Sequence, residues 1–311
     1  MSIQAGPARK LRTGRRFSAS RREAVEGFLC ITPWLLGFIL FAAGPMLASV
    51  WLAVTDYEIL RPISFIGLNN FTKAIQDPLF TKSLWNTAYY TALYVPLHLM
   101  TALLAAMLLN VKVHGLRFYR VIFYIPSIMP AVATAFLWMW IFNPNYGLAN
   151  ALLDLLGLPP QKWLFDETLA KPSFVIMGLW GLGSAMLVFL AGLQGIDPVL
   201  YEAAEIDGAN HWVQFWRITI PMLTPVLFFN LIIGIIGSFQ VFTTAFIATD
   251  GGPNNATLFY VLYIYRQGWQ FAKMGYASAL AWVLFLLVLL LTLIQFKMAG
   301  RWVYYETGRT K

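Results

Sequence analysis

The sequence predicts an all-α polytopic membrane protein with six transmembrane helices. Of its 311 residues, 59% are apolar and only 12% are charged, whereas soluble domains carry about 25% charged residues. The charges crowd into short connecting segments and leave six long, almost uncharged stretches, each able to cross about 30 Å of hydrocarbon as a helix. A net charge of +8 then fits a membrane surface, so lipid is an expected partner and nucleic acid is not.

A basic tail over residues 1–27 precedes the first expected span. That span is too long for the apolar core of a signal peptide and has no small-residue cleavage site, so we interpret it as a retained helix. The six expected spans are 28–54, 84–110, 119–142, 173–193, 218–246 and 276–296. We expect four parts: the tail 1–27, the first helix with an external loop over 28–83, a membrane core over 84–297 and a second tail over 298–311.

Basic residues are divided unequally between the two sides that six spans define. One side holds 15 of the 22 Lys and Arg, in segments 1–27, 111–120, 194–217 and 297–311. The other side holds 7, in segments 55–83, 143–172 and 247–275. Because cytoplasmic loops carry the excess of Lys and Arg, we expect both termini in the cytoplasm.

Several expected spans carry Pro or Gly at depth. Such breaks are tolerated where protein or a water-filled cavity satisfies the freed backbone groups, so they favour a solute pathway over a plain anchor. The residues concerned are Pro45, Pro96, Pro126, Pro130, Gly178, Gly181, Gly183, Gly234 and Gly237.

The expected spans show no obvious ion relay and the chain no nucleotide site. His98 is the only ionisable side chain well inside a span, and a neutral imidazole packed among helices explains it. The chain has no Gly-Lys pair and hence no Walker A motif, and its lone Cys30 and three scattered histidines have no metal-ligand spacing. We therefore expect no catalytic residue, metal or cofactor in this chain. It is either a passive pore or one subunit of a transporter whose energy source is another subunit.

The segment after the fourth span is unusual for its side of the membrane. Residues 194–209 carry four acids and no base. Asp197 followed by Pro198 predicts a helix start, and Gly208 predicts its end. A helix of about ten residues is too short to be stable alone, so we expect it to pack against a partner. A solvated loop helix is the simpler alternative.

The residues of this helix match a known signature. ABC import permeases carry E-A-A, three residues, G, nine residues, I, one residue, L-P, and the chain has Glu202-Ala203-Ala204, Gly208, Ile218 and Pro221 in that register, with Ile220 in place of Leu. The chain therefore resembles ABC importer permeases with the type I fold. The resemblance implies that 84–297 is the permease core and that the short helix is the coupling helix, with Glu202, Ala203, Ala204, Glu205, Asp207 and Gly208 contacting an ATPase.

Other stretches resemble the carbohydrate-uptake group of these permeases, of the maltose and glycerol-phosphate type. They are Phe65-Ile66-Gly67-Leu68-Asn69-Asn70-Phe71, Asn143-Pro144 with Gly147-Leu148-Ala149-Asn150, Leu190-Ala191-Gly192-Leu193-Gln194, and Thr249-Asp250-Gly251-Gly252-Pro253 with Ala256-Thr257. The resemblance implies import of a sugar or sugar-like solute across a bacterial or archaeal cytoplasmic membrane. It implies as partners a second homologous permease, two ATP-binding cassette subunits that hold ATP and Mg, and an extracytoplasmic solute-binding protein.

A sugar site in mid-membrane should combine aromatic faces with neutral hydrogen-bonding groups. Polar residues at the helix breaks are the candidates, although each also fits a role in helix packing. They are Ser127, Trp180, Ser184, Ser238, Gln240 and Thr243, with Thr244 beside them. Gly237-Ser238-Phe239-Gln240 is the most prominent polar interruption.

Three other functions remain open from the residues alone. A passive channel or facilitator explains six spans without an ion relay, but it leaves the signature from Glu202 to Pro221 unused. A membrane anchor leaves the Pro and Gly breaks unexplained, and an enzyme is disfavoured because no polar catalytic cluster is evident at any depth. The sequence does not identify which sugar is carried.

Overall fold

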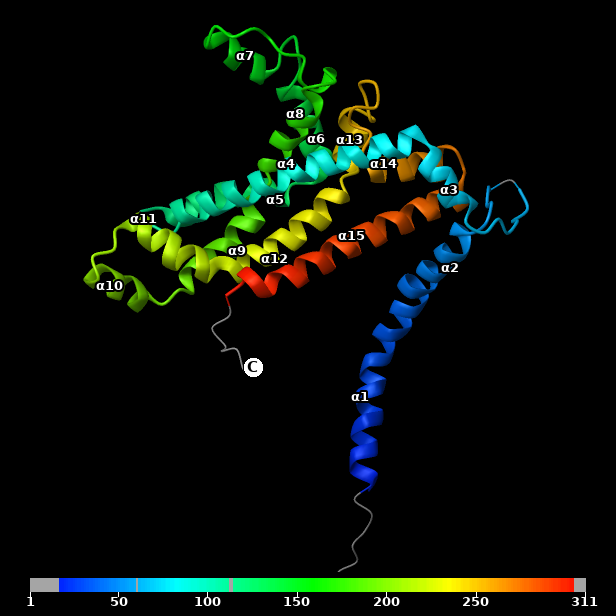
Figure 1. Ribbon diagram of the computed structural model, residues 1–311, viewed down its shortest axis with the longest axis horizontal. Coiled ribbons are helices and arrows are strands. Elements are labelled where there is room, and N and C mark those ends of the chain that lie inside the picture. The colour runs from blue at the N-terminus through cyan, green and yellow to red at the C-terminus, as the bar shows by residue number, and fades with distance from the viewer. Residues whose placement is uncertain (1–16, 60, 112–113, 305–311) are drawn as a thin grey trace, which may run out of the picture. The chain divides into compact units, whose positions relative to one another are not determined.

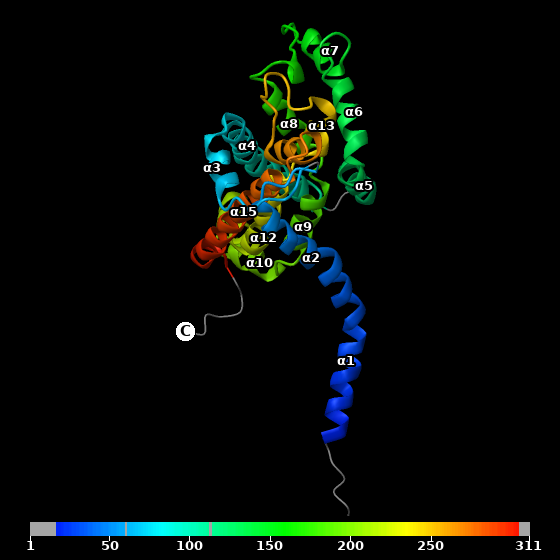
Figure 2. The ribbon, with the colours of Figure 1, turned by 90° about the vertical axis from the view of Figure 1, so that its right-hand side faces the viewer.

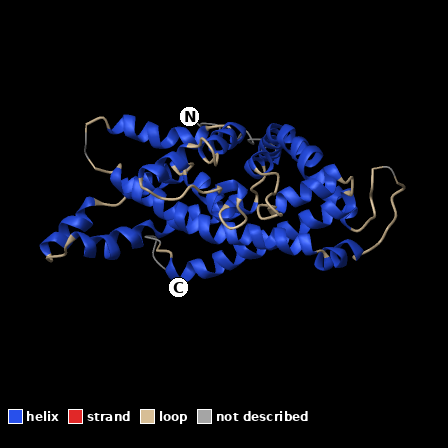
Figure 3. Cartoon of the chain, turned by 90° about the horizontal axis from the view of Figure 1, so that it is seen from above, coloured by secondary structure: helices blue, strands red, loops and turns tan. Residues whose placement is uncertain are grey.

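The computed structural model describes residues 17–59, 61–111 and 114–304. Helices joined by loops make up this part of the chain, with two isolated bridges, Thr55 to Phe65 and Glu58 to Lys273, and no named strand (Figure 3). The chain divides into two units, Met1–Trp51 and Leu52–Lys311. Most of the basic tail expected over 1–27 lies outside the described residues.

The first unit is one apolar helical stretch. Helix α1 (Phe17–Phe38) runs through a π-helical turn (Ile39–Ala43) into α2 (Gly44–Ala53), whose last residues begin the second unit. Together they form a candidate membrane span, Glu23–Ala53, with none of the most apolar window buried in the molecule. This agrees with the first expected span.

The second unit contains the remaining helices (Figure 1). In chain order they are α3 (Asn69–Gln76), α4 (Pro78–Leu108), α5 (Leu116–Ile128), α6 (Ala131–Ile141), α7 (Leu148–Leu155), η2 (Trp163–Phe165), α8 (Ala170–Leu179), α9 (Gly183–Gln194), α10 (Pro198–Ile206), α11 (His211–Gln214), η3 (Phe215–Thr219), α12 (Ile220–Phe239), α13 (Thr243–Ala248), α14 (Tyr260–Tyr265), η4 (Arg266–Gln270) and α15 (Met274–Trp302). In both side views α6, α7, α8 and α13 lie on the same side of α12 and α15 (Figures 1 and 2).

Four of the expected spans are single candidate membrane spans, and the other two are bent pairs of helices. The single spans are Glu23–Ala53, Pro78–Leu108, His211–Ala248, which has a short non-helical break at 240–242, and Met274–Trp302. The spans expected over 119–142 and 173–193 are instead bent pairs, α5 with α6 at 100° and α8 with α9 at 48°. The described chain therefore has six spans if each bent pair counts as one, and the two broken spans are among those in which Pro and Gly breaks were expected.

The breaks have local causes in the sequence. Pro130 follows the last residue of α5 by two positions, and proline both removes a backbone donor and disfavours helix in the residue before it. The α8–α9 bend falls at residues 180–182, beside Gly181 and Gly183. Of the residues expected to interrupt these spans, Pro130, Gly181 and Gly183 lie at the breaks, whereas Pro126 and Gly178 lie inside α5 and α8.

Helix α4 is the centre of the second unit and packs against α8, α9, α12 and α14. One half of α4 lies in a core of aromatic and aliphatic residues that includes Tyr90, Phe174 and Phe259. The other half presents Ala102, Ala105 and Ala106 to α9 and α12. Small residues let membrane helices approach closely and gain van der Waals contact, which explains this alanine face.

Candidate functional site

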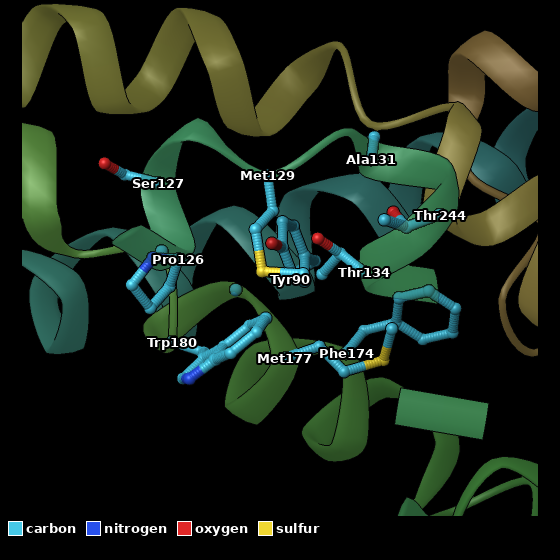
Figure 4. Close-up of a pocket in the computed structure, with 12 residues that line it drawn as sticks. Tyr90, Pro126, Ser127, Met129, Ala131, Thr134, Phe174, Met177, Trp180 and Thr244 are labelled. Atoms are coloured by element: carbon cyan, nitrogen blue, oxygen red, sulfur yellow. The ribbon is translucent and has the colours of Figure 1, made fainter. Parts of the chain in front are cut away.

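A cavity of about 250 Å³ lies where α4, α5, α6, α8 and α13 meet. Its wall contains aromatic rings, methionines and hydroxyl groups and no charged side chain, and it is formed by Tyr90, Pro126, Ser127, Met129, Ala131, Thr134, Phe174, Met177, Gly178, Trp180, Gly181 and Thr244. Tyr90, Met129, Thr134 and Trp180 converge on it (Figure 4). We call it the upper cavity.

A second cavity of about 370 Å³ lies between α4, α9 and α12. We call it the lower cavity. It is also mainly apolar, with His98, Asn230 and two serines as its polar groups, and is formed by Tyr90, Tyr94, His98, Ser184, Ala185, Val188, Phe229, Asn230, Ile233, Gly234, Gly237, Ser238 and Val241.

The two cavities share Tyr90, the first of a row of rings on α4 that lines the lower cavity. Tyr90 stacks on Tyr94 with centroids 5.1 Å apart, and Tyr94 contacts His98 at 4.9 Å. Residues four apart lie on one helix face, so the row follows directly from the helix. Gly178 of α8 makes room for it, because a Cβ there would lie 2.6 Å from Tyr94 Cε2 and 2.8 Å from the Tyr90 hydroxyl.

The sequence analysis missed Tyr90, Tyr94 and Asn230, and it interpreted His98 as a packing residue. The spacing of residues 90, 94 and 98 was a usable signal, since three ring-bearing side chains four apart form a stripe. Pro and Gly breaks do not reveal this stripe, because α4 remains helical through Pro96.

Five of the seven predicted pathway residues line these cavities. Ser127, Trp180 and Thr244 line the upper cavity, and Ser184 and Ser238 line the lower one. The Ser127 hydroxyl is directed away from the centre of the upper cavity and donates to the Tyr124 carbonyl at 2.7 Å (Figure 4). Gln240 and Thr243 are absent from both walls.

Gln240 instead marks a break in the fifth span. Helix α12 ends at Phe239, residues 240–242 are not helical, and α13 begins at Thr243. Gln240 is exposed at the C-cap of α12, while Ser238 is 2% exposed and donates its hydroxyl proton to the Ile235 carbonyl at 2.9 Å. The polar interruption predicted at Gly237–Gln240 is thus a real interruption of the helix.

The short helix expected after Asp197 is α10. The Asp197 carboxylate accepts a hydrogen bond from the Val199 amide at 2.9 Å, as an N-cap residue does. At the other end Gly208 has φ of +78°. The Ala209 amide donates to the Ala204 carbonyl at 2.9 Å and the Gly208 amide to Glu205 at 3.0 Å, the bonding pattern of a Schellman C-cap.

Helix α10 buries none of its residues. Glu202, Ala203, Glu205 and Asp207 are exposed, as is Gly208 just past its end, and Ala204 is half-buried. Its apolar side chains are also exposed, Ile206 to 87%. One side chain fastens it to the fifth span: the Tyr201 and Thr219 hydroxyls are hydrogen-bonded at 2.9 Å. A capped helix with unpartnered apolar and acidic groups suits a docking element.

Asn150 organises the connection between α6 and α8. Its Nδ2 donates to the carbonyls of Pro144 and Gln161 at 2.8 and 2.9 Å, and its Oδ1 accepts from the Gln161 amide at 3.0 Å and the Trp163 indole at 2.8 Å. Two donors and two acceptor sites are the full capacity of an amide side chain.

Asp166 lies further along the same connection. Hydrogen bonds from the Thr168 hydroxyl and then from the Leu169 and Thr168 amides hold the pKa of the Asp166 carboxyl below its usual value.

The Gly-Gly-Pro loop after α13 is tied to α4. Asn86 Nδ2 donates to the carbonyls of Asn255 at 2.9 Å and Leu258 at 3.2 Å, and the Tyr260 amide donates to the Thr87 hydroxyl at 2.9 Å. Asp250 forms an ion pair with Arg266 at 3.3 Å. The loop therefore closes over the end of α4 opposite to α10 (Figure 1).

Comparison with known proteins identifies the family to which this chain belongs. Residues 80–302 match the family described as binding-protein-dependent transport system inner membrane component. The chain is 41% identical over 292 residues to a probable ABC transporter permease, YesP, of Bacillus subtilis strain 168, covering 92% of this chain and 94% of that one. It is 34% identical to the trehalose/maltose permease MalF of Thermococcus litoralis, covering 89% and 94%.

Solved structures agree on the fold. A chain of a bacterial ABC transporter involved in the import of the acidic polysaccharide alginate superposes with a TM-score of 0.81 at 24% identity, covering 92% of this chain and 99% of that one. These matches favour an importer subunit over the passive channel, the anchor and the enzyme. The chain belongs to the family of binding-protein-dependent transport system inner membrane components, and is a multi-pass permease subunit of an ABC importer that works with a solute-binding protein.

Proposed function

We propose that this permease carries a sugar or sugar-like solute through the upper and lower cavities. The observation that carries the proposal is their lining: aromatic rings with hydroxyl and amide groups and, His98 apart, no ionisable group other than tyrosine. Pyranose rings offer apolar faces and many neutral hydroxyls, which such a wall complements. Relatives named for arabinooligosaccharides, lactose and trehalose/maltose support the same class.

The Tyr90–Tyr94–His98 row supplies an aromatic surface along the lower cavity, and Tyr90 extends it to the wall of the upper one. The Ser238 hydroxyl keeps acceptor capacity after donating to Ile235, so a solute hydroxyl can donate to it. Ser127, Trp180 and Ser184 are the other wall positions proposed for contact. Gln240 and Thr243 stay candidates at the break between α12 and α13.

We further propose that α10 is the coupling helix. Its partner is a pair of ATP-binding cassette subunits that hold ATP and Mg, and this chain pairs with a second homologous permease. Glu202, Ala203, Ala204, Glu205, Asp207 and Gly208 are the positions that meet the ATPase. Exposed carboxylates suit a basic groove, and the caps at Asp197 and Gly208 give the rigidity that a lever needs. Both termini are proposed to face the cytoplasm.

Two measurements on the reconstituted complex, solute uptake and ATP hydrolysis, test both the proposed sugar solute and the proposed dependence of uptake on a partner ATPase. The complex is placed in vesicles with its binding protein and supplied with labelled neutral oligosaccharides built from arabinose, glucose or galactose. Sugar-dependent hydrolysis accompanied by uptake supports the proposal. Hydrolysis that no sugar in the set stimulates contradicts the substrate class.

Variants of α10 test the coupling assignment in the same vesicles. Gly208→Val places a β-branched residue at a left-handed backbone position, which costs about 1–2 kcal/mol, and should uncouple hydrolysis from uptake. Gly208→Asn is the matched control, because Asn tolerates that conformation, and it should retain coupling. Glu202→Ala should weaken the ATPase interface by about 2–5 kcal/mol if its pair is buried. Normal coupling in both Gly208→Val and Glu202→Ala would show that α10 is not the coupling element.

A further inference from the structure

Two lysines lie near the start of α4 and the start of α8. Lys82 lies in the second turn of α4, and Lys171 is the second residue of α8. Both are half-buried. Lys82 is the like charge that acts on Lys171. Two ammonium groups held close together raise the local positive potential.

The contacts of these lysines leave most of their donors free. Lys171 Nζ donates to Asn86 Oδ1 at 3.3 Å and lies 5.4 Å from the centre of the Tyr89 ring. Lys82 Nζ donates to the Asn254 carbonyl at 2.6 Å. An ammonium has three donors, so the pair retains capacity for further acceptors. Asn86 is 1% exposed and held by two loop carbonyls, which fixes the oxygen that faces Lys171.

Within the described residues neither lysine forms an ion pair with a carboxylate. Ion pairs are formed there by Arg61 with Glu58 and by Arg266 with Asp250. Glu167 is the opposite charge that acts on Lys171, but it lies beyond ion-pair distance and its Oε2 accepts from Asn254 Nδ2 at 3.5 Å. A half-buried ammonium without a counter-charge is costly, so a ligand that brings a carboxylate would be stabilised here.

Along α4 and α8 the pair precedes residues that line the upper cavity. Asn86 is one helical turn from Tyr90, and Lys171 is about one turn from Phe174, and both rings line that cavity. The lysines are also recessed rather than exposed, which fits a solute better than a flat protein docking surface, where the charged rim is solvent-accessible.

We propose that Lys82 and Lys171 form an entry site for the carboxylate of an acidic sugar, so that the solute class includes uronate-bearing oligosaccharides. The inference rests on the proposed sugar function and narrows it. The carboxylate accepts charge-assisted hydrogen bonds from the free donors of both ammonium groups, while the rest of the solute lies against Tyr90 and Phe174. A neutral sugar gains nothing from the pair.

Uptake of digalacturonate and of its neutral counterpart galactobiose by the reconstituted complex tests the proposal. Lys171→Met keeps the length of the side chain and removes the charge, and Lys82→Met repeats the test on α4. Each should raise KM for digalacturonate about tenfold, the scale of a charged hydrogen bond, and leave galactobiose unchanged. Lys171→Arg should retain most digalacturonate uptake. Lys162→Met, at an exposed lysine of the same connection, should change neither.

Three results would overturn the proposal. The first is uptake of galactobiose but not digalacturonate by the unaltered complex, which leaves the sugar function standing. The second is an equal loss for both solutes in Lys171→Met. The third is a weaker affinity of the variant complex for the empty binding protein, which would assign the lysines to protein docking. If neither of these solutes nor any neutral oligosaccharide is carried, the proposed function itself fails.

Discussion

Gly178 has no side chain, and the space this leaves determines the shape of the proposed solute pathway. The rings of Tyr90 and Tyr94 occupy the space that a Cβ at this position would fill, at 2.8 and 2.6 Å. Both rings line the lower cavity and Tyr90 also lines the upper one. A methyl group at residue 178 must therefore displace the row of rings on α4 and change the shape of both cavities.

Gly178→Ala should reduce uptake several-fold and destabilise the complex by about 1–3 kcal/mol, as overpacking does. Gly300→Ala is the matched control, because a Cβ there would meet no atom within 4 Å and the residue lines neither cavity. Uptake rate and the thermal unfolding midpoint of the purified complex measure the two effects. Equal behaviour of the two variants would mean that the ring positions on α4 do not control passage.

Among the elements, the connection between α6 and α8 depends on one amide. Asn150 is 8% exposed and makes four hydrogen bonds across this segment. Asn150→Ala removes all four and leaves the Trp163 indole and the Gln161 amide without these acceptors. Each buried group that loses its partner costs about 1–3 kcal/mol, so the segment should open locally while the membrane helices stay packed.

Hydrogen exchange of residues 144–163 measures this opening, with protection expected to fall by a factor of about 30 or more in Asn150→Ala. Asn145→Ala, at an exposed position of the same segment, should leave protection unchanged. Protection lost equally in α4 and α12 would instead indicate global unfolding, and an unaltered segment would show that Asn150 is not its organising residue.

The helices also show which parts of the fold can be predicted from the sequence. Helix α10 was predicted with its cap at Asp197 and its end near Gly208, because capping depends on neighbouring residues alone. The bends of α5–α6 and α8–α9 were only partly predicted. Pro130 and Gly181 indicate where a helix breaks, but the angles of 100° and 48° depend on packing against α4, α9 and α13, which involves residues distant in the chain.

At the scale of the whole molecule, the distribution of Lys and Arg predicts the orientation of the chain in the membrane. The side with 15 of the 22 Lys and Arg should be cytoplasmic, and α10 lies in one of its segments. A reporter that is active only outside the cytoplasm should be inactive when fused after Lys311 and active when inserted at Asn254. Strong activity after Lys311 would reverse the orientation and place α10 out of reach of any cytoplasmic ATPase.

Charge and hydropathy predicted the span count and the signature at Glu202 predicted the family, whereas the cavities could not be predicted. Ser127, Trp180, Ser184 and Ser238 were chosen for being polar or aromatic at breaks, and they line cavities because breaks leave space. Tyr90 and Tyr94 lie in an unbroken helix, and only the opposing Gly178 and the packing of α8 on α4 make them wall residues.

The bond between Tyr201 and Thr219 has a mechanical consequence. It fastens α10 at 2.9 Å to the stretch that continues into α12, whose 20 residues span about 30 Å. Tilting such a rod by about 5° about its α10 end sweeps the far end through about 2.6 Å. Ser238 sits at that far end, beside the lower cavity. Helix α12 is thus a long lever. A small rotation at α10 becomes a displacement about the length of a hydrogen bond at the wall of the lower cavity.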